Sequence, residues 1–132
     1  MEKKSPIILI IDDDLDFKEV VSVKLKSVGY SVFTADNGEE GLAKIKENKP
    51  DLLLLDIEMP VMNGVEMFLK MKSEPEIANL KTIFLTNYGD PQKESSWLDE
   101  KFAHEVGALE YIKKSEDLDK IVAMVGGVLG KV

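Results

Sequence analysis

Residues 7–14 read IILIIDDD, an unbroken apolar run that stops at three aspartates. Two later stretches have the same form: residues 52–56 read LLLLD, and residues 83–86 read IFLT. A strand with one face in water alternates apolar and polar residues, whereas these runs are apolar throughout, which indicates strands buried on both faces. Such strands belong in a parallel sheet covered by helices on each side, so the runs predict an α/β fold.

Weaker strand-like segments at residues 31–35 and 109–112 raise the number of predicted strands to five. Between the strands, apolar residues recur at the spacing of helices. These helical stretches are residues 17–28, 42–45, 65–72 and 118–125. Strand and helix therefore alternate along the chain. This order predicts a doubly wound open sheet rather than a barrel, because a barrel needs more such units.

The composition is that of one globular domain. The chain has 132 residues, of which 44% are hydrophobic and 32% charged, enough for a core of its own. Its 25 acidic and 17 basic residues give a net charge of −8, so the surface repels phosphate backbones and anionic lipid. We expect no direct binding to nucleic acid or membrane.

Nothing in the sequence directs the chain out of the cytoplasm. There is no cysteine, which excludes disulfides and thiolate metal sites. The N-terminus lacks the apolar stretch of a signal peptide, and no apolar run approaches the length of a membrane span. We therefore expect a single cytoplasmic domain, residues 1–132, with no output domain.

Polar side chains follow the apolar runs, at the edge of a parallel sheet where ligands collect. They are Asp12, Asp13, Asp14, Asp56, Thr86, Lys113 and Lys114. Carboxylates gathered at one edge repel one another and stay ionised together only around a cation. Their oxygens suit Mg²⁺ or Mn²⁺, while a hydroxyl and an ammonium beside such an ion can hold a phosphoryl group. The pattern predicts a site for phosphoryl transfer.

Four motifs in this order resemble the receiver domains of two-component response regulators. They are the pair Asp12-Asp13, DIEMPVMNG at residues 56–64, LTN at 85–87 and GALEYIKK at 107–114. The resemblance covers essentially the whole chain and implies a flavodoxin-like sheet with strand order 2-1-3-4-5. It also implies a signalling domain rather than an enzyme. This domain would accept a phosphoryl group from a sensor histidine kinase or a histidine phosphotransfer protein.

The resemblance assigns roles to the acidic residues. Asp56 is the implied phosphoacceptor, and it is implied to share a Mg²⁺ ion with Asp12, Asp13 and the backbone carbonyl of Glu58. As a side chain, Glu58 is expected to repel an anionic phosphoryl donor.

The resemblance also assigns the switching residues. Thr86 and Lys114 would contact the phosphoryl oxygens, and Tyr111 would change rotamer as Thr86 moves. This movement would reshape the face formed by the fourth helix, fifth strand and fifth helix, where an unknown downstream protein is expected to bind.

Three features depart from the pattern of these receivers. Ser115 stands where a proline usually follows the lysine, so the bond before it need not be cis. Asn87 replaces a small residue and is expected to crowd the route to the phosphoryl group. Thr86 and Lys114 are unusually far apart, which predicts a lengthened fourth helix and entry loop.

Other interpretations remain open from sequence. Asp14 is either a fourth site carboxylate or, as we predict, the N-cap of the first helix. Asp12 and Asp14 also resemble the start of haloacid-dehalogenase phosphatases, although Asp16 departs from that motif. A third possibility is a receiver-like interaction module that works without phosphorylation.

Overall fold

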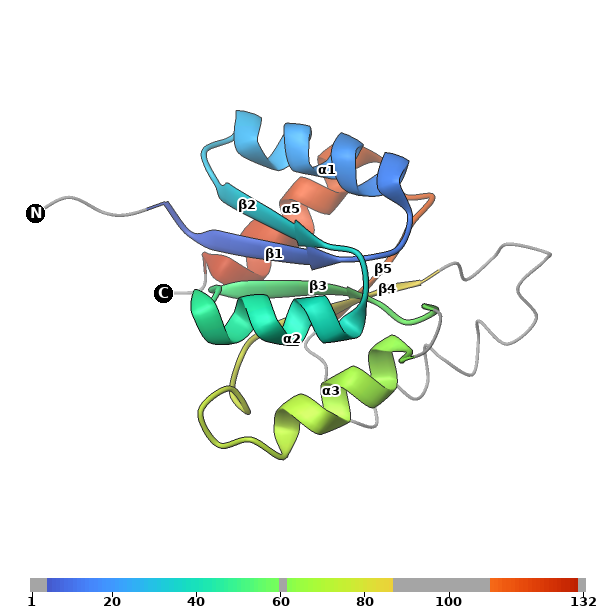
Figure 1. The fold of residues 1–132 in the computed structure, drawn as a ribbon. Helices are drawn as coiled ribbons and strands as arrows, with labels where there is room; N and C mark the ends of the chain where they lie inside the picture. The colour runs from blue at the N-terminus through green and yellow to red at the C-terminus, as the bar shows by residue number, and fades with distance from the viewer. Residues whose placement is uncertain (1–4, 60–61, 87–109, 131–132) are drawn as a thin grey trace, which may run out of the picture.

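The computed structural model describes residues 5–59, 62–86 and 110–130. In chain order, its elements are β1 (Ile7–Ile11), α1 (Leu15–Ser27), β2 (Ser31–Ala35), α2 (Gly38–Glu47), β3 (Leu52–Asp56), α3 (Gly64–Lys72), β4 (Thr82–Thr86), β5 (Glu110–Lys113) and α5 (Leu118–Leu129) (Figure 1). The strands match the predicted segments to within one residue at each end. The predicted fourth helix, with Asn87, lies outside the described residues.

The five strands form one parallel sheet in the order β2-β1-β3-β4-β5, which confirms the predicted topology. Helices α1 and α5 cover one face of the sheet, and α2 and α3 cover the other (Figure 1). This is the doubly wound, flavodoxin-like arrangement. All carboxyl ends of the strands therefore meet at one edge.

Each face of the sheet carries its own hydrophobic core. Leu55 and Phe84 point to the α2 and α3 side, where Phe84 meets Phe68 edge to face with ring centroids 5.2 Å apart. Leu54 and Leu85 point to the α1 and α5 side. Every residue of β3 and β4 is buried, which explains why their sequences show no polar alternation. The buried central strands β3 and β4 therefore hold the residues at their carboxyl ends in fixed positions.

Short polar side chains cap the N-termini of the helices, which lie at the carboxyl edge of the sheet. These N-caps are Asp14, Asn37, Asn63 and Asp117. The Asp14 carboxylate accepts a hydrogen bond from the backbone N–H of Phe17 at 3.1 Å, which confirms its predicted role as a cap. Asn63 and Glu66 form a reciprocal capping box that fixes the start of α3 next to the end of β3.

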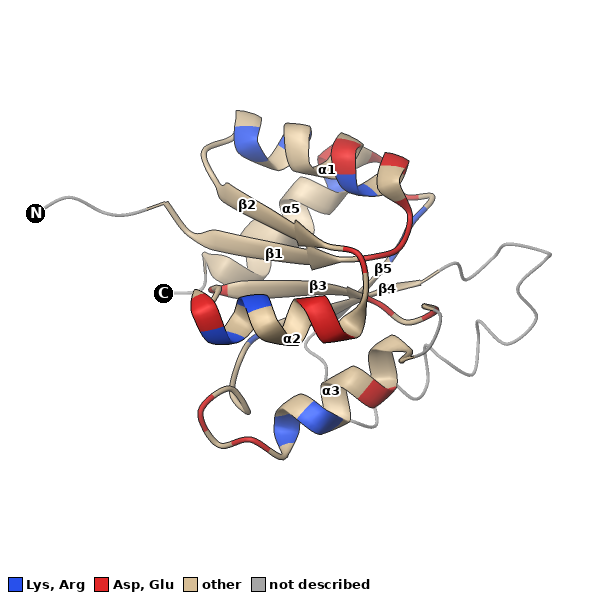
Figure 2. Cartoon of the chain, viewed as in Figure 1, with Lys and Arg blue, Asp and Glu red and all other residues tan. Residues whose placement is uncertain are grey.

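Charge is distributed unevenly along the helices. In α1, α2 and α3 the first turn carries acidic residues and the last turn carries lysines, as each helix dipole favours. In Figure 2, acidic segments lie at the carboxyl-edge end of all three helices; basic segments lie at the opposite ends, where α2 also carries an acidic one.

Two further backbone features are clear in the described part of the chain. Its peptide bonds are all trans, including the bond between Lys114 and Ser115. None of its helices has the length and apolar character needed to cross a membrane.

Candidate functional site at the carboxyl edge

The strand register brings the predicted site residues to the same edge. Ile11 pairs with Leu55, so Asp12 and Asp56 emerge from adjacent strands at the same level. Asp56 in turn pairs with Leu85, one residue before Thr86. The backbone N–H of Lys114 donates to the carbonyl oxygen of Thr86 at 2.8 Å, which ties the end of β5 to the end of β4.

Three carboxylates converge at this edge. Asp12, Asp13 and Asp56 each place one oxygen within 4.8 Å of the others. Asp12 and Asp56 are buried, with 0% and 1% of their surface exposed, whereas Asp13 is open to solvent. The backbone N–H of Glu58 donates to the Asp56 carboxylate at 3.2 Å and so helps to orient it.

Lys114 lies inside this acidic cluster. Its Nζ is 2.9 Å from Oδ2 of Asp12, 3.8 Å from Oδ2 of Asp56 and 4.0 Å from Oδ2 of Asp14. The ammonium also sits over the ring of Phe17, 5.0 Å from its centroid, within range of a cation–π interaction. Of the adjacent lysines Lys113 and Lys114, it is therefore Lys114 that the structure places among the carboxylates.

The contacts of Asp12 leave one oxygen incompletely satisfied. Oδ1 accepts hydrogen bonds from Nζ of Lys114 at 3.1 Å and from the backbone N–H of Asp14 at 2.9 Å. Oδ2 is buried and near the ammonium, yet among the described residues it has no hydrogen-bond donor in suitable geometry. Three carboxylates and one ammonium leave the cluster net negative. Hard oxygen ligands and an excess negative charge fit a divalent cation such as Mg²⁺.

In the absence of a bound metal ion, the electrostatics of the cluster favour the protonated form of the Asp56 carboxyl group. Burial, followed by the charge of Asp12, raises the pKa of Asp56 to about 8, although Lys114 acts in the opposite direction. Burial lowers the pKa of Lys114, but the charges of Asp56 and Asp12 outweigh burial, so the net shift is upward. Lys114 therefore stays an ammonium at neutral pH, while Asp56 is poised to lose its proton when positive charge arrives.

Thr86 and Tyr111 lie on one face of the sheet. Thr86 is the buried last residue of β4, two positions after Phe84, so the two side chains share a face. Tyr111 pairs with Phe84 in register and packs, partly buried, against the core beneath α2 and α3. This shared face is the arrangement that coupled movement of Thr86 and Tyr111 would require.

Gly64 allows α3 to start directly against the end of β3. Its backbone N–H donates to the carbonyl oxygen of Ile57 at 2.8 Å. A Cβ at this position would lie 2.2 Å from the backbone oxygen of Asp56. The glycine thus sets how closely the helix approaches the main chain of the candidate phosphoacceptor.

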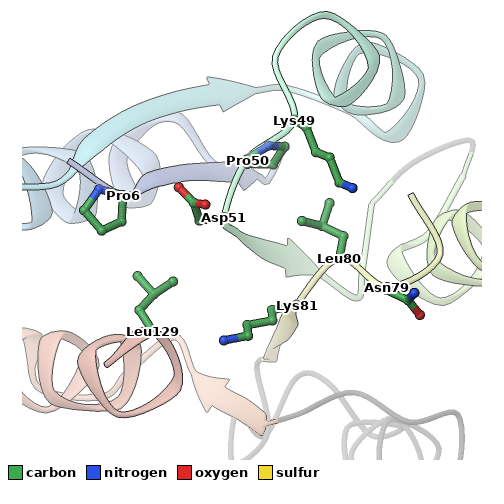
Figure 3. Close-up of a pocket in the computed structure, with 8 residues that line it drawn as sticks. All are labelled: Pro6, Lys49, Pro50, Asp51, Asn79, Leu80, Lys81 and Leu129. Atoms are coloured by element: carbon green, nitrogen blue, oxygen red, sulfur yellow. The ribbon is translucent and has the colours of Figure 1, made fainter. Parts of the chain in front are cut away.

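A separate hollow of about 410 Å³ lies at the opposite edge of the sheet (Figure 3). Two of its polar side chains are already used within the fold. Asp51 accepts a hydrogen bond from the backbone N–H of Ile7 at 2.7 Å, and Lys81 donates to the carbonyl oxygen of Val128 at 3.4 Å. None of the predicted site residues lines this hollow, so it is distinct from the acidic cluster.

The family model for the response regulator receiver domain matches residues 8–126. The chain belongs to this family. Sporulation initiation phosphotransferase F of Bacillus subtilis is 35% identical over 116 residues, with 86% of each chain covered. The phosphate regulon transcriptional regulatory protein PhoB of Pseudomonas aeruginosa is 34% identical over 92% of this receiver domain and 51% of its own length. The receiver domain thus spans about half the length of the first transcriptional regulators it matches.

Solved structures agree with this assignment. A response regulator from Chloroflexus aurantiacus superposes with a TM-score of 0.85 at 30% identity, covering 97% of this chain and 100% of that one. Chemotaxis protein CheY4 of Vibrio cholerae has a TM-score of 0.80 at 27% identity, covering 95% and 99%. The receiver fold predicted from the motifs is therefore confirmed.

Sequence reasoning missed two contacts of the cluster. Asp14 was predicted as a helix cap, yet its second oxygen also approaches Lys114. Phe17 was predicted only as part of a helix face, yet its ring contacts the same ammonium. Both contacts depend on how α1 is rotated against the sheet. The apolar spacing of α1 indicated which side is buried but not which residue would reach Lys114.

Proposed function

We propose that this receiver domain accepts a phosphoryl group on Asp56 from a phosphohistidine of a sensor histidine kinase or a histidine phosphotransfer protein. The proposal rests chiefly on the buried carboxylate of Asp56, which sits within 3.8 Å of an ammonium and beside two further aspartates. Membership of the receiver family supports it. Membership of this family does not support the phosphatase interpretation.

The transfer requires Asp56 to act as a nucleophile. One carboxylate oxygen forms the new bond to phosphorus while the bond from phosphorus to the histidine nitrogen breaks, and the imidazole leaves with that electron pair. Only the ionised carboxylate can attack, whereas burial raises the pKa of Asp56 to about 8. A Mg²⁺ ion held by Asp12, Asp13, Asp56 and the Glu58 carbonyl would favour the ionised form and offset the charge of the phosphoryl oxygens.

The other residues would receive and report the new charge. Lys114, now paired with Asp12, is close enough to Asp56 to pair with a phosphoryl oxygen, and the Thr86 hydroxyl would donate to another. Movement of Thr86 would let Tyr111 follow on the same face of the sheet. That change would alter the surface around β5 and α5, where we propose that a protein partner binds in the cytoplasm.

Phosphorylation can be tested with a small phosphodonor. Incubation with acetyl phosphate and Mg²⁺ is expected to add one phosphoryl group per chain, as read by intact-protein mass. We expect no labelling with a chelator or in Asp56→Asn. Asp51→Asn is the matched control, because Asp51 is an aspartate at the opposite edge of the sheet. Labelling that persists in Asp56→Asn would refute the assignment of Asp56, and a parent that is never labelled would favour the interaction-module hypothesis.

Mg²⁺ is expected to raise the thermal midpoint of the unphosphorylated protein. At about ten times the dissociation constant, mass action contributes roughly 1.4 kcal/mol, which corresponds to a rise of about 5 °C for a domain of this size. Asp13→Asn should reduce this rise, because it removes one of the three carboxylates proposed to bind the ion. Melting curves recorded with Mg²⁺ and with a chelator measure both effects. An equal rise in the parent and in Asp13→Asn would remove Asp13 from the proposed ligand set.

A further inference from the structure

Lys18 is a buried cation that the proposed transfer does not use. It lies in the second turn of α1, and only 4% of its side chain is exposed, which is rare for lysine. Its Nζ forms an ion pair with Asp36, whose own side chain is 62% exposed, and donates to the carbonyl oxygen of Ala35 at 3.4 Å. A lysine is buried at a cost, so its contacts identify what it holds in place.

The carbonyl oxygen that Lys18 contacts is also an anchor of the acidic cluster. The backbone N–H of Asp12 donates to this same oxygen of Ala35 at 3.1 Å. The ammonium and the Asp12 amide thus converge on one atom at the end of β2. Through this shared atom, Lys18 is linked to the residue whose two oxygens face Lys114 and the other carboxylates.

A second link runs through the start of α1. The backbone N–H of Lys18 donates to the carbonyl oxygen of Asp14 at 3.1 Å, and the N–H of Asp14 donates to the Asp12 carboxylate at 2.9 Å. The segment from Asp12 to Asp14 is therefore held at both ends by groups that Lys18 contacts. Removal of the ammonium would leave the hydrogen bonds within α1 intact but would remove its contacts with Ala35 and Asp36 at the end of β2.

We propose that Lys18 is a positioning residue that directs the Asp12 carboxylate, and with it Asp13, toward a bound divalent cation. The inference rests on the proposed function, since it concerns the same ligand set. Residues that orient metal ligands commonly change metal affinity by about 10- to 100-fold when replaced. A role in stability alone would instead lower the unfolding midpoint and leave Mg²⁺ affinity unchanged.

Three variants separate these roles. Lys18→Met keeps the length of the side chain but removes its charge and its hydrogen-bond donors. Lys18→Arg keeps the charge and the donors. Lys24→Met is the matched control, because Lys24 lies in the same helix and forms an ion pair of 2.8 Å with Asp119 of α5, away from the cluster. Calorimetric titration with Mg²⁺ alone, below each variant's melting temperature, measures affinity independently of phosphorylation.

We expect Lys18→Met to bind Mg²⁺ about 10-fold more weakly than the parent. Lys18→Arg and Lys24→Met should both bind Mg²⁺ as tightly as the parent. If Lys18→Met does not fold, Asp36→Asn serves instead, since it removes one partner of Lys18 and should weaken Mg²⁺ binding by about threefold. If Lys18→Met, or Asp36→Asn in its place, binds Mg²⁺ as tightly as the parent, the inference is overturned. Failure of the parent itself to bind Mg²⁺ would refute the proposed metal site.

Discussion

Replacing Asp56 with asparagine is expected to stabilise the Mg²⁺-free protein by roughly 3 kcal/mol at pH 8 and to have little effect below pH 4. Burial and the charge of Asp12 raise the pKa of Asp56 from 3.8 to about 8. The unfolded chain therefore loses this proton near pH 4, whereas the folded protein keeps it until near pH 8. Between these values the folded state binds more protons, so stability falls as the pH rises.

The expected size follows from the shift. Each pKa unit corresponds to about 1.4 kcal/mol, and we take less than the full shift because Asp12 and Asp56 titrate as an interacting pair. Asparagine carries no charge, so its stability should be nearly flat across this pH range. Mg²⁺ should restore the stability of the parent at pH 8 but affect Asp56→Asn much less.

Urea unfolding at several pH values, with a chelator or with Mg²⁺, measures these differences. Asp51→Asn is again the control, because Asp51 lies at the other edge of the sheet, where its carboxylate accepts a hydrogen bond from the backbone of Ile7. Equal pH slopes in the parent and in Asp56→Asn would show that Asp56 ionises in the folded protein as readily as in the unfolded chain.

Gly64→Ala is expected to destabilise the fold by about 2 kcal/mol or more and to weaken Mg²⁺ binding at the same time. The new Cβ would lie 2.2 Å from the backbone oxygen of Asp56, and a backbone atom cannot move aside as a flexible side chain can. Either α3 or the end of β3 must shift. The gain in helix propensity, about 1 kcal/mol, is too small to offset this clash.

Gly127→Ala is the matched control for Gly64→Ala. Gly127 lies within α5, and a Cβ there meets no atom within 4 Å. Alanine at this site should therefore stabilise the protein by about 0.5–1 kcal/mol. The two substitutions make the same chemical change and should have opposite signs in a denaturant titration. Equal stability of the two variants would mean that the contact between α3 and the main chain of Asp56 is not tight.

Much of the fold could be predicted because its central strands are buried on both faces. The runs at residues 7–11 and 52–55 have no polar position, and few structures other than a covered parallel sheet accept such runs. The grouping of Asp12, Asp13 and Asp56 followed, because parallel strands end at one edge. Their functional roles stay predictions, as do those of Thr86 and Tyr111.

The surroundings of the site could not be predicted in the same way. The contacts of Phe17 and Lys18 depend on the rotation of α1 against the sheet and on the path of β2, which local apolar spacing does not determine. The raised pKa of Asp56 depends on burial and on its distance from Asp12, both tertiary quantities. The lengthened fourth helix and the effect of Asn87 concern residues outside the described part of the chain.

The charged turns of α1, α2 and α3 contribute an electric dipole moment along the strands of the described part of this receiver domain. Acidic first turns add to the aspartates at the carboxyl edge, and the lysines of the last turns lie at the far end of each helix. In solution a basic protein surface would exert a torque on this dipole and turn the edge with Asp56 toward itself before contact. Such pre-orientation increases the association rate. The interaction is screened beyond the Debye length, about 8 Å in physiological salt, so the increase becomes smaller as the ionic strength rises.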